Sequence, residues 1–251
     1  MADSPDQQAP PDQEALDEQG PPDDNALIAR LHQLRDRIAD AATESGRQPQ
    51  DVQLLLATKT VPAERIAVAL RAAFTLIGEN RVQEIVGKAD ALQAIPHSTQ
   101  LIGHLQRNKV NAVLPLIDGM HSLDSAELAQ RIDRRLTGDE AGRMLPVMIQ
   151  VNVSGEDSKS GVAPEAAAAL ADAVRGCPRL ELTGLMTIGL NSTDLAEVRR
   201  GYARLRELRD AIVPGGELSM GMSGDFADAI AEGATVVRLG SAAFGNRRPT
   251  G

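Results

Sequence analysis

The chain of 251 residues is long enough for one large domain or two small ones, and its 42% apolar content can fill a sizeable core. Aromatic residues are scarce, with no Trp and a single Tyr, so Leu, Val, Ile and Ala must dominate the core, which suits parallel strands buried on both faces better than a β-sandwich. The formal net charge of −9 argues against a general nucleic-acid binder, and the lone Cys177 excludes an intramolecular disulfide.

The sequence also bears on the compartment. It contains no run of the roughly 18 apolar residues that a membrane span needs. The N-terminus is acidic and polar, without the basic start and apolar run of a secretory signal. A single cysteine is typical of a reducing environment. We therefore expect a cytoplasmic protein that does not enter a membrane.

The first 24 residues differ in composition from the rest. They carry eight acidic side chains, no basic one and the pairs Pro10-Pro11 and Pro21-Pro22. Because such a segment cannot bury apolar surface, we expect a disordered acidic tail over 1–24 and one folded domain over 25–251. The tail accounts for most of the net charge, and the remaining chain is close to neutral.

From residue 25 onward, helical and strand patterns alternate. Leu27, Leu31, Leu34 and Ile38 recur every three or four residues and predict an amphipathic helix before the first strand. Short apolar runs then predict eight strands, at 54–57, 74–77, 100–102, 117–122, 146–153, 181–186, 217–220 and 235–239. Helical patterns follow the first seven strands, from 62, over 80–94, from 105, and over 125–137, 164–175, 195–212 and 225–231. Pro62 is expected to open the first of these, and Ser122 or Asp124 to cap the helix over 125–137.

This alternation predicts an α/β fold with a parallel sheet. We expect the eight units to close into a single (β/α)8 TIM barrel with an extra N-terminal helix. An open, doubly wound sheet is the competing fold, but no G-x-G-x-x-G follows the first predicted strand.

Polar residues and glycines gather where the predicted strands end, which is where a barrel of this kind builds its active site. Lys59 follows the apolar run of the first strand. Most lysines are solvated surface groups, but a partly desolvated amine is easier to deprotonate and can attack a carbonyl. Lys59 is therefore a candidate nucleophile.

Two further segments have the composition of an anion site. Gly221 and Gly224 allow a backbone to approach a ligand, and Ser223 offers a hydroxyl beside a helix start. Gly240 and Ser241, after the eighth strand, form a similar donor set. Barrels often bind phosphate after strands 7 and 8. The alternative for the first segment, a flexible glycine loop, is equally compatible with its composition.

Arg238 and His104 leave more than one interpretation open. Arg238 lies in an apolar strand, so it needs either a carboxylate partner or a ligand, and composition alone favours the ion pair. His104 lies in a donor-rich segment and could contact a ligand or cap a helix. The four histidines lack metal-site spacing, and Cys177 has no partner ligand.

Seven ordered blocks of sequence show a resemblance that covers about residues 25–248. They are Ala57-Thr58-Lys59-Thr60, residues 77–84 (IGENRVQE), 101–109 (LIGHLQRNK), 150–153 (QVNV) with 158–161 (SKSG), 184–188 (GLMTI), 218–225 (LSMGMSGD), and 237–240 (VRLG). In this order they resemble the pyridoxal phosphate homeostasis proteins, relatives of the alanine racemase barrel. The resemblance implies an alanine racemase type of barrel that binds pyridoxal 5′-phosphate (PLP).

The resemblance also implies roles for individual residues. Lys59 takes the position of the lysine that binds PLP covalently as a Schiff base. Ser223, Gly224, Gly240 and Ser241 fall where the family binds the phosphate. Arg238 falls where an arginine faces the pyridine nitrogen, and Asn80, His104 and Met220 fall on the pocket wall. An arginine disfavours protonation of that nitrogen, which argues against aminotransferase-like chemistry but does not exclude racemisation.

The same resemblance suggests a binding role rather than an enzyme. Alanine racemases add a C-terminal β domain that supplies a tyrosine base from the partner subunit, whereas this sequence stops soon after the eighth strand. Its only tyrosine, Tyr202, lies on the apolar stripe of a helix and is expected to be a core residue. We therefore expect a protein of intracellular PLP and amino-acid homeostasis without substantial turnover, possessing no metal site.

Two alternatives remain from the sequence. One is a small PLP-dependent amino-acid racemase or decarboxylase, and the other is a barrel that binds a different phosphorylated metabolite without an imine at Lys59. The expected partners are PLP and PLP-requiring apoenzymes, with no nucleic acid. Without an added β domain we expect a monomer.

Overall fold

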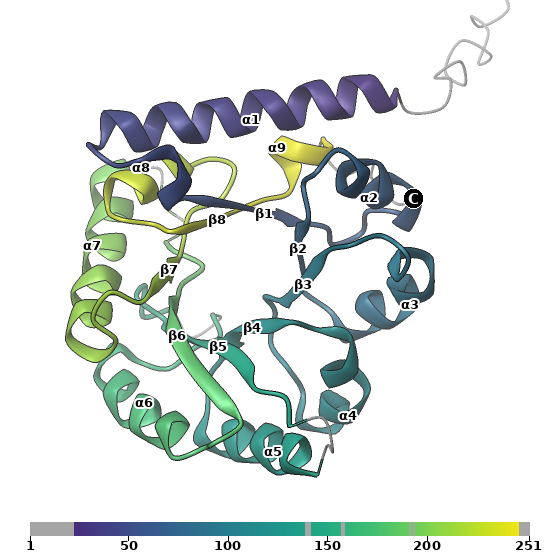
Figure 1. Cartoon of the computed structure of the whole chain (residues 1–251). Coiled ribbons are helices and arrows are strands. Elements are labelled where there is room, and N and C mark those ends of the chain that lie inside the picture. The colour runs from purple at the N-terminus through teal and green to yellow at the C-terminus, as the bar shows by residue number, and fades with distance from the viewer. Residues whose placement is uncertain (1–22, 139–141, 157–158, 191, 193, 246–251) are drawn as a thin grey trace, which may run out of the picture.

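In a computed structural model, eight parallel strands close into a barrel in which each strand pairs with its neighbour in sequence and β8 returns to β1. The structure describes residues 23–138, 142–156, 159–190, 192 and 194–245. The strands are β1 (Gln53–Ala57), β2 (Leu76–Glu79), β3 (Ser98–Leu101), β4 (Gly119–Leu123), β5 (Leu145–Gln150), β6 (Leu180–Met186), β7 (Glu217–Ser219) and β8 (Val236–Leu239). Figure 1 shows them as an inner ring, which confirms the predicted (β/α)8 barrel.

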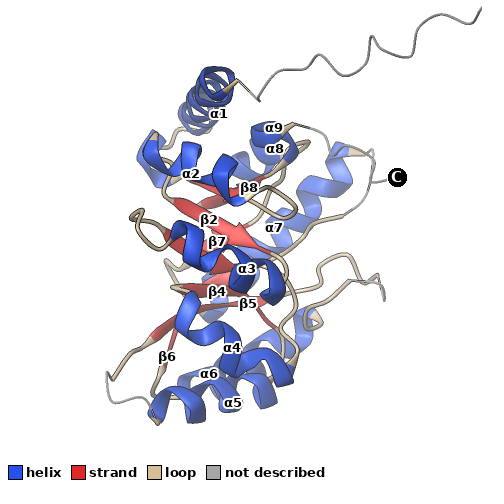
Figure 2. Cartoon of the chain, turned by 90° about the vertical axis from the view of Figure 1, so that its right-hand side faces the viewer, coloured by secondary structure: helices blue, strands red, loops and turns tan. Residues whose placement is uncertain are grey.

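Helices surround the strands, as Figure 2 shows from the side. They are α1 (Asp24–Glu44), α2 (Ala63–Arg71), α3 (Val82–Leu92), α4 (Val110–Val113), α5 (Ala126–Thr137), α6 (Ala167–Arg175), α7 (Leu195–Ile212), α8 (Phe226–Ala231) and α9 (Ser241–Phe244). Short 3-10 helices are η2 (Pro49–Asp51), η3 (Arg107–Lys109), η4 (Leu114–Leu116) and η5 (Pro164–Ala166).

The extra N-terminal helix is present as α1. It buries Leu27, Leu31, Leu34 and Ile38, the stripe that the sequence predicts, and lies outside the ring across α8, α9 and α2. Asp23 caps it, because its side chain accepts a hydrogen bond from the Asn25 amide at 2.9 Å. The last two residues of the predicted acidic tail thus cap and begin a helix, and residues 1–22 lie outside the described residues.

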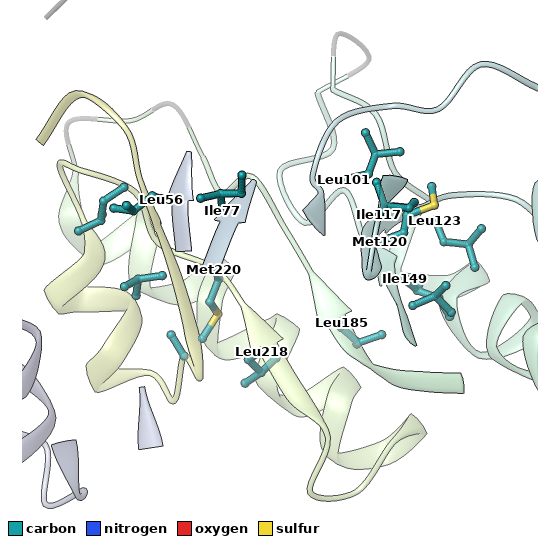
Figure 3. Close-up of a cluster of buried hydrophobic side chains, with 14 of the residues drawn as sticks. Leu56, Ile77, Leu101, Ile117, Met120, Leu123, Ile149, Leu185, Leu218 and Met220 are labelled. Carbon is teal, nitrogen blue, oxygen red and sulfur yellow. The ribbon is translucent and has the colours of Figure 1, made fainter. Parts of the chain in front are cut away.

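The barrel has two apolar layers. Leu55, Ile102, Met148, Met186 and Val236 pack inside the ring. Side chains from the opposite faces of the strands pack against the helices, and Figure 3 shows Leu56, Ile77, Leu101, Met120, Ile149, Leu185, Leu218 and Met220 among them. Leu55 and Leu56 show how successive residues of one strand serve the two layers.

Local interactions move several predicted boundaries. β2 begins at Leu76, not at Phe74, because the Phe74 amide donates to Ala69 O and the Ala73 amide to Leu70 O, which ends α2 in a Schellman motif. Ala73 has the positive φ of 67° that this motif requires. The Phe74 ring then packs edge-on against His32 of α1, with 5.4 Å between ring centroids.

Two helical predictions are corrected. Ser125 caps α5 by accepting from the Leu128 amide, while Ser122 is buried in β4 and donates to Gly103 O at 2.7 Å. The helix expected from 105 divides into η3, α4 and η4. Pro115 cannot donate the backbone hydrogen bond that would continue α4 into η4. The four-residue helix α9, directly after β8, was not predicted.

Candidate functional site

The loops after β7 and β8 meet at the end of the barrel where the strands finish, which we call the mouth. The Ser223 and Ser241 hydroxyl oxygens are 3.1 Å apart, and the Ala242 amide donates to Ser223 Oγ at 3.2 Å. Gly224 and Ser241 are exposed, whereas Ser223 and Gly240 are half-buried. The structure therefore brings together the four residues that the sequence assigns to a phosphate, as two hydroxyls beside glycine backbone.

Backbone geometry explains why this loop needs its glycine. Gly221 has φ of +92°, and a Cβ there would lie 2.6 Å from the Ala229 Cβ. Its carbonyl accepts from the Arg238 amide at 3.0 Å, which draws the loop against β8. Asp225 secures the other side, because its two carboxylate oxygens accept from the Met222 amide at 2.6 Å and the Tyr202 hydroxyl at 2.8 Å.

Arg238 lies inside the barrel just below these loops. Val236 is part of the interior cluster, and the alternation along β8 places Arg238 on the same face. Only 5% of the residue is exposed. Its guanidinium donates to Ser219 Oγ at 2.9 Å and to Thr187 O at 2.7 Å.

The environment of Arg238 differs from the ion pair that composition favours. Burial lowers the pKa of Arg238 to about 10, against the opposing influence of Tyr202 and Asp225, so the guanidinium remains charged at neutral pH. No carboxylate among the described residues forms an ion pair with it. A buried cation held only by neutral oxygens can still bind an acceptor on a ligand.

His121 of β4 is a site residue that the sequence did not single out. Its Nδ1 lies 3.0 Å from Ser219 Oγ, and 5% of the residue is exposed. Burial, aided by the charge of Arg238, lowers the pKa of His121 to about 3. Because Arg238 can only donate to Ser219 Oγ, we assign the Ser219 proton to His121 Nδ1 and the neutral ring's own proton to Nε2. The signal available in the sequence was a histidine within a predicted strand, between Met120 and Ser122.

Lys59 follows β1, the strand that pairs with β8. Leu55 and Ala57 belong to the interior cluster, and Lys59 is next on that alternation, whereas Thr58 faces outward. Lys59 is exposed, as expected for a residue at the mouth. The β8 loop is close to this strand end, since a Cβ on Gly240 would lie 3.1 Å from Ala57 O. The lysine and the paired serines therefore rise from neighbouring parts of the mouth.

The three predicted wall residues occupy different positions. Asn80 is half-buried after β2 and packs its backbone against Gly103, where a Cβ would meet Asn80 O at 2.2 Å. His104 pairs with Asp124 at 2.8 Å and its side chain is 53% exposed. Met220 is fully buried in the layer between strands and helices, so at the end of β7 Ser219, not Met220, faces the barrel interior.

Tyr202 is also fully buried, which confirms its prediction as a core residue. Within the described part of the chain, no cluster of three or more His, Cys, Asp or Glu side chains could hold a metal ion. None of the helices described is both long and apolar enough to cross a membrane.

Comparisons with known proteins first define the class of barrel. A family model described as "Alanine racemase, N-terminal domain" matches residues 29–248. An alanine racemase from Clostridium difficile has a TM-score of 0.71 at 13% identity, covering 90% of this chain and 58% of that one, a likeness of fold alone. The barrel is therefore of the alanine racemase N-terminal type.

More similar proteins define the family. A protein of Pseudomonas aeruginosa, 44% identical over 213 residues and matched over 84% of this chain and 91% of its own, is named "Pyridoxal phosphate homeostasis protein". The structure of PipY from Synechococcus elongatus, described with PLP bound, is 33% identical, with a TM-score of 0.76 over 87% of this chain and 100% of that one. The chain belongs to the pyridoxal phosphate homeostasis protein family.

Proposed function

We propose that this chain binds PLP in the mouth of the barrel, covalently as a Schiff base with Lys59, and serves PLP and amino-acid homeostasis without substantial turnover. The observation that carries the proposal is the convergence of Ser223 and Ser241 at 3.1 Å beside the buried Arg238. Lys59 stands at the end of the neighbouring strand. PipY, a relative with the same fold, is described with PLP bound.

The donor set fits the chemistry of the cofactor. Phosphate oxygens accept hydrogen bonds, and Ser223, Gly224, Gly240 and Ser241 offer hydroxyls and backbone amides at one point of the mouth. Arg238 offers a fixed cation to the acceptor nitrogen of a pyridine ring. PLP supplies an aldehyde that captures a primary amine, and Lys59 provides that amine.

The remaining predicted contacts are weaker parts of the proposal. Asn80 is assigned to the wall after β2, and His104 to the rim, where Asp124 orients its ring. Met220 supports the wall from behind, because its side chain lies in the outer apolar layer. A racemase or decarboxylase is the disfavoured alternative, since the relatives at 37–44% identity are named as homeostasis proteins.

The expected setting follows from the same role. PLP-requiring apoenzymes are the expected recipients of the cofactor, and the protein is expected to act as a cytoplasmic monomer. A purified sample of the full chain should elute at the volume of a 26.6 kDa protein.

The test is capture of PLP by the purified chain. PLP should give a visible Schiff-base absorbance, and borohydride should fix one PLP on Lys59, located by peptide mass spectrometry. Lys59→Ala should fold normally and lose both signals, while the matched variant Lys109→Ala should keep them. Pyridoxal, which lacks the phosphate, should bind much more weakly than PLP.

Two results would overturn this proposal. One is a protein that stays colourless after reconstitution, and the other is fixation of PLP on another lysine. The claim of little turnover fails separately, if a screen for racemised or decarboxylated amino acids finds turnover near 1 s⁻¹ or above, within the ordinary enzyme range.

A further inference from the structure

Three charged side chains lie outside the barrel wall, under the loop that carries Lys59. Glu79 ends β2, and Glu84 and Lys88 lie one turn apart on α3. The Lys88 ammonium bonds Glu79 Oε1 at 2.6 Å and Glu84 Oε2 at 2.9 Å. We call these three residues the Glu79–Lys88–Glu84 cluster.

The cluster bonds the chain on both sides of Lys59. Before it, the Thr58 hydroxyl donates to Glu79 Oε1 at 2.7 Å, and the Thr58 carbonyl accepts from Lys88 at 3.0 Å. After it, the Thr60 amide donates to Glu84 Oε2 at 2.6 Å. Thr60 has a φ of +64°, the left-handed region that costs a threonine energy, so these bonds hold the loop in a turn it would not adopt freely.

Burial indicates that the cluster is not there for stability alone. Glu79 is 1% exposed, and its Oε2 has no hydrogen-bond partner among the described residues. Burial raises the pKa of Glu79 in spite of its bonds to Lys88 and Thr58, so keeping the carboxylate ionised here costs folding free energy. Apolar residues of similar size are often as good or better in such positions. What they could not supply is a set of acceptors and donors for Thr58 and Thr60.

We propose that Glu79, Lys88 and Glu84 are positioning residues for Lys59, which hold its backbone so that the amine meets the carbonyl of a bound cofactor. They act through Thr58 and Thr60 and touch no ligand themselves. The part of this proposal that concerns capture of PLP by Lys59 rests on the proposed function. The part that concerns the conformation of the loop does not depend on it. The cluster therefore predicts both a rigid loop in the free protein and efficient capture in the bound one.

Matched substitutions separate positioning from general stability. Glu84→Ala removes the acceptor of the Thr60 amide, whereas Glu84→Gln keeps an acceptor oxygen of nearly the same reach. Thr58→Val removes the hydroxyl that bonds Glu79, whereas Thr58→Ser keeps it. Asp133→Ala is the structural control, because Asp133 Oδ1 accepts from the Arg179 amide at 2.8 Å just before β6 begins, at the end of the barrel opposite the mouth.

Two readouts are measured on each folded variant. Hydrogen exchange of the 58–61 segment without cofactor reports the loop, and titration of the Schiff-base absorbance with PLP reports capture. We expect Glu84→Ala and Thr58→Val to speed exchange and to weaken PLP capture by roughly tenfold each. Glu84→Gln and Thr58→Ser should recover most of both losses, and Asp133→Ala should show neither.

Each failure has its own signature. Unchanged exchange and capture in Glu84→Ala and Thr58→Val would overturn the positioning role, and so would an equal weakening of capture in Asp133→Ala. If the wild type fixes no PLP on Lys59, the proposed function fails. In that case, faster hydrogen exchange of the 58–61 segment in Glu84→Ala would by itself still support the cluster as the residues that hold the loop.

Discussion

His121 should make the stability of this protein depend on pH in a way that a single substitution removes. The ring is enclosed in the barrel beside the Arg238 guanidinium, with Ser219 between them. The informative change is His121→Asn, since an amide oxygen can accept the Ser219 hydroxyl in place of Nδ1 but does not titrate between pH 5 and 7. The void left by the smaller side chain lowers the free energy of unfolding by the same amount at both pH values.

The size of the effect follows from the pKa. Burial lowers the pKa of His121 to about 3, below the value of 6.5 in an unfolded chain. Between these two pH values the histidine is protonated in the unfolded state and neutral in the folded state. Its contribution to stability is complete above about pH 6.5 and is lost as the pH falls toward 3. Between pH 7 and pH 5 the loss is about 2 kcal/mol, which lowers the melting temperature by about 4–8 °C for a domain of this size.

The assay is urea unfolding of the wild type and His121→Asn at pH 7 and pH 5. The wild type should lose about 2 kcal/mol more than the variant between the two pH values. Met148→Ala, which creates a void in the same barrel interior but keeps the histidine, should retain the wild-type dependence on pH. Parallel losses in the wild type and His121→Asn would refute the neutral, enclosed ring.

Two other substitutions test the support of the loop after β7. Tyr202→Phe removes the hydroxyl that bonds Asp225 at 2.8 Å and should lower the free energy of unfolding by about 1–2 kcal/mol in urea, while PLP is still fixed on Lys59. Loss of that fixation would show that Tyr202 has a role at the site beyond packing. Gly221→Ala forces a side chain into a backbone of positive φ against Ala229 and should cost about 3 kcal/mol in the same assay. Gly87→Ala in α3, where a Cβ meets nothing within 4 Å, should instead stabilise by up to about 1 kcal/mol, and equal effects would contradict the strain at Gly221.

The barrel was predictable because its signals are local. The predicted strands are short apolar runs, and the first seven are each followed by a helical pattern that is visible in a single sequence. The same holds for α1, whose buried stripe of Leu27, Leu31, Leu34 and Ile38 stands out at helical spacing. The boundaries were less accurate where a backbone motif intervened, as when Phe74 completes the end of α2 and delays β2.

The site was predictable only in part, since its contacts join distant segments. Ser223 and Ser241 could be paired because both follow strands that must be neighbours in a closed barrel. His121 could not be paired with Ser219, which is 98 residues away on a strand that does not neighbour its own. Glu79 and Glu84 were visible in the sequence as part of a family motif, but their contact with the Lys59 loop depends on how α3 packs over β2.

The protonation states of Arg238 and its neighbours favour a site that binds a cofactor over a site that uses it for catalysis. Acid–base chemistry on a bound amino acid needs a group whose pKa lies near the working pH. Arg238 gives up its proton only near pH 10, and His121 takes one only near pH 3. Burial, with the nearby Asp225, raises the pKa of Tyr202, so its hydroxyl stays protonated and is donated to that carboxylate. Burial thus keeps each of the three groups in one protonation form at neutral pH, and each group is hydrogen-bonded to another part of the barrel. Under the proposed function they orient the ring and the loop beside it and move no proton, which leaves the amine of Lys59 as the group through which PLP is taken up and released.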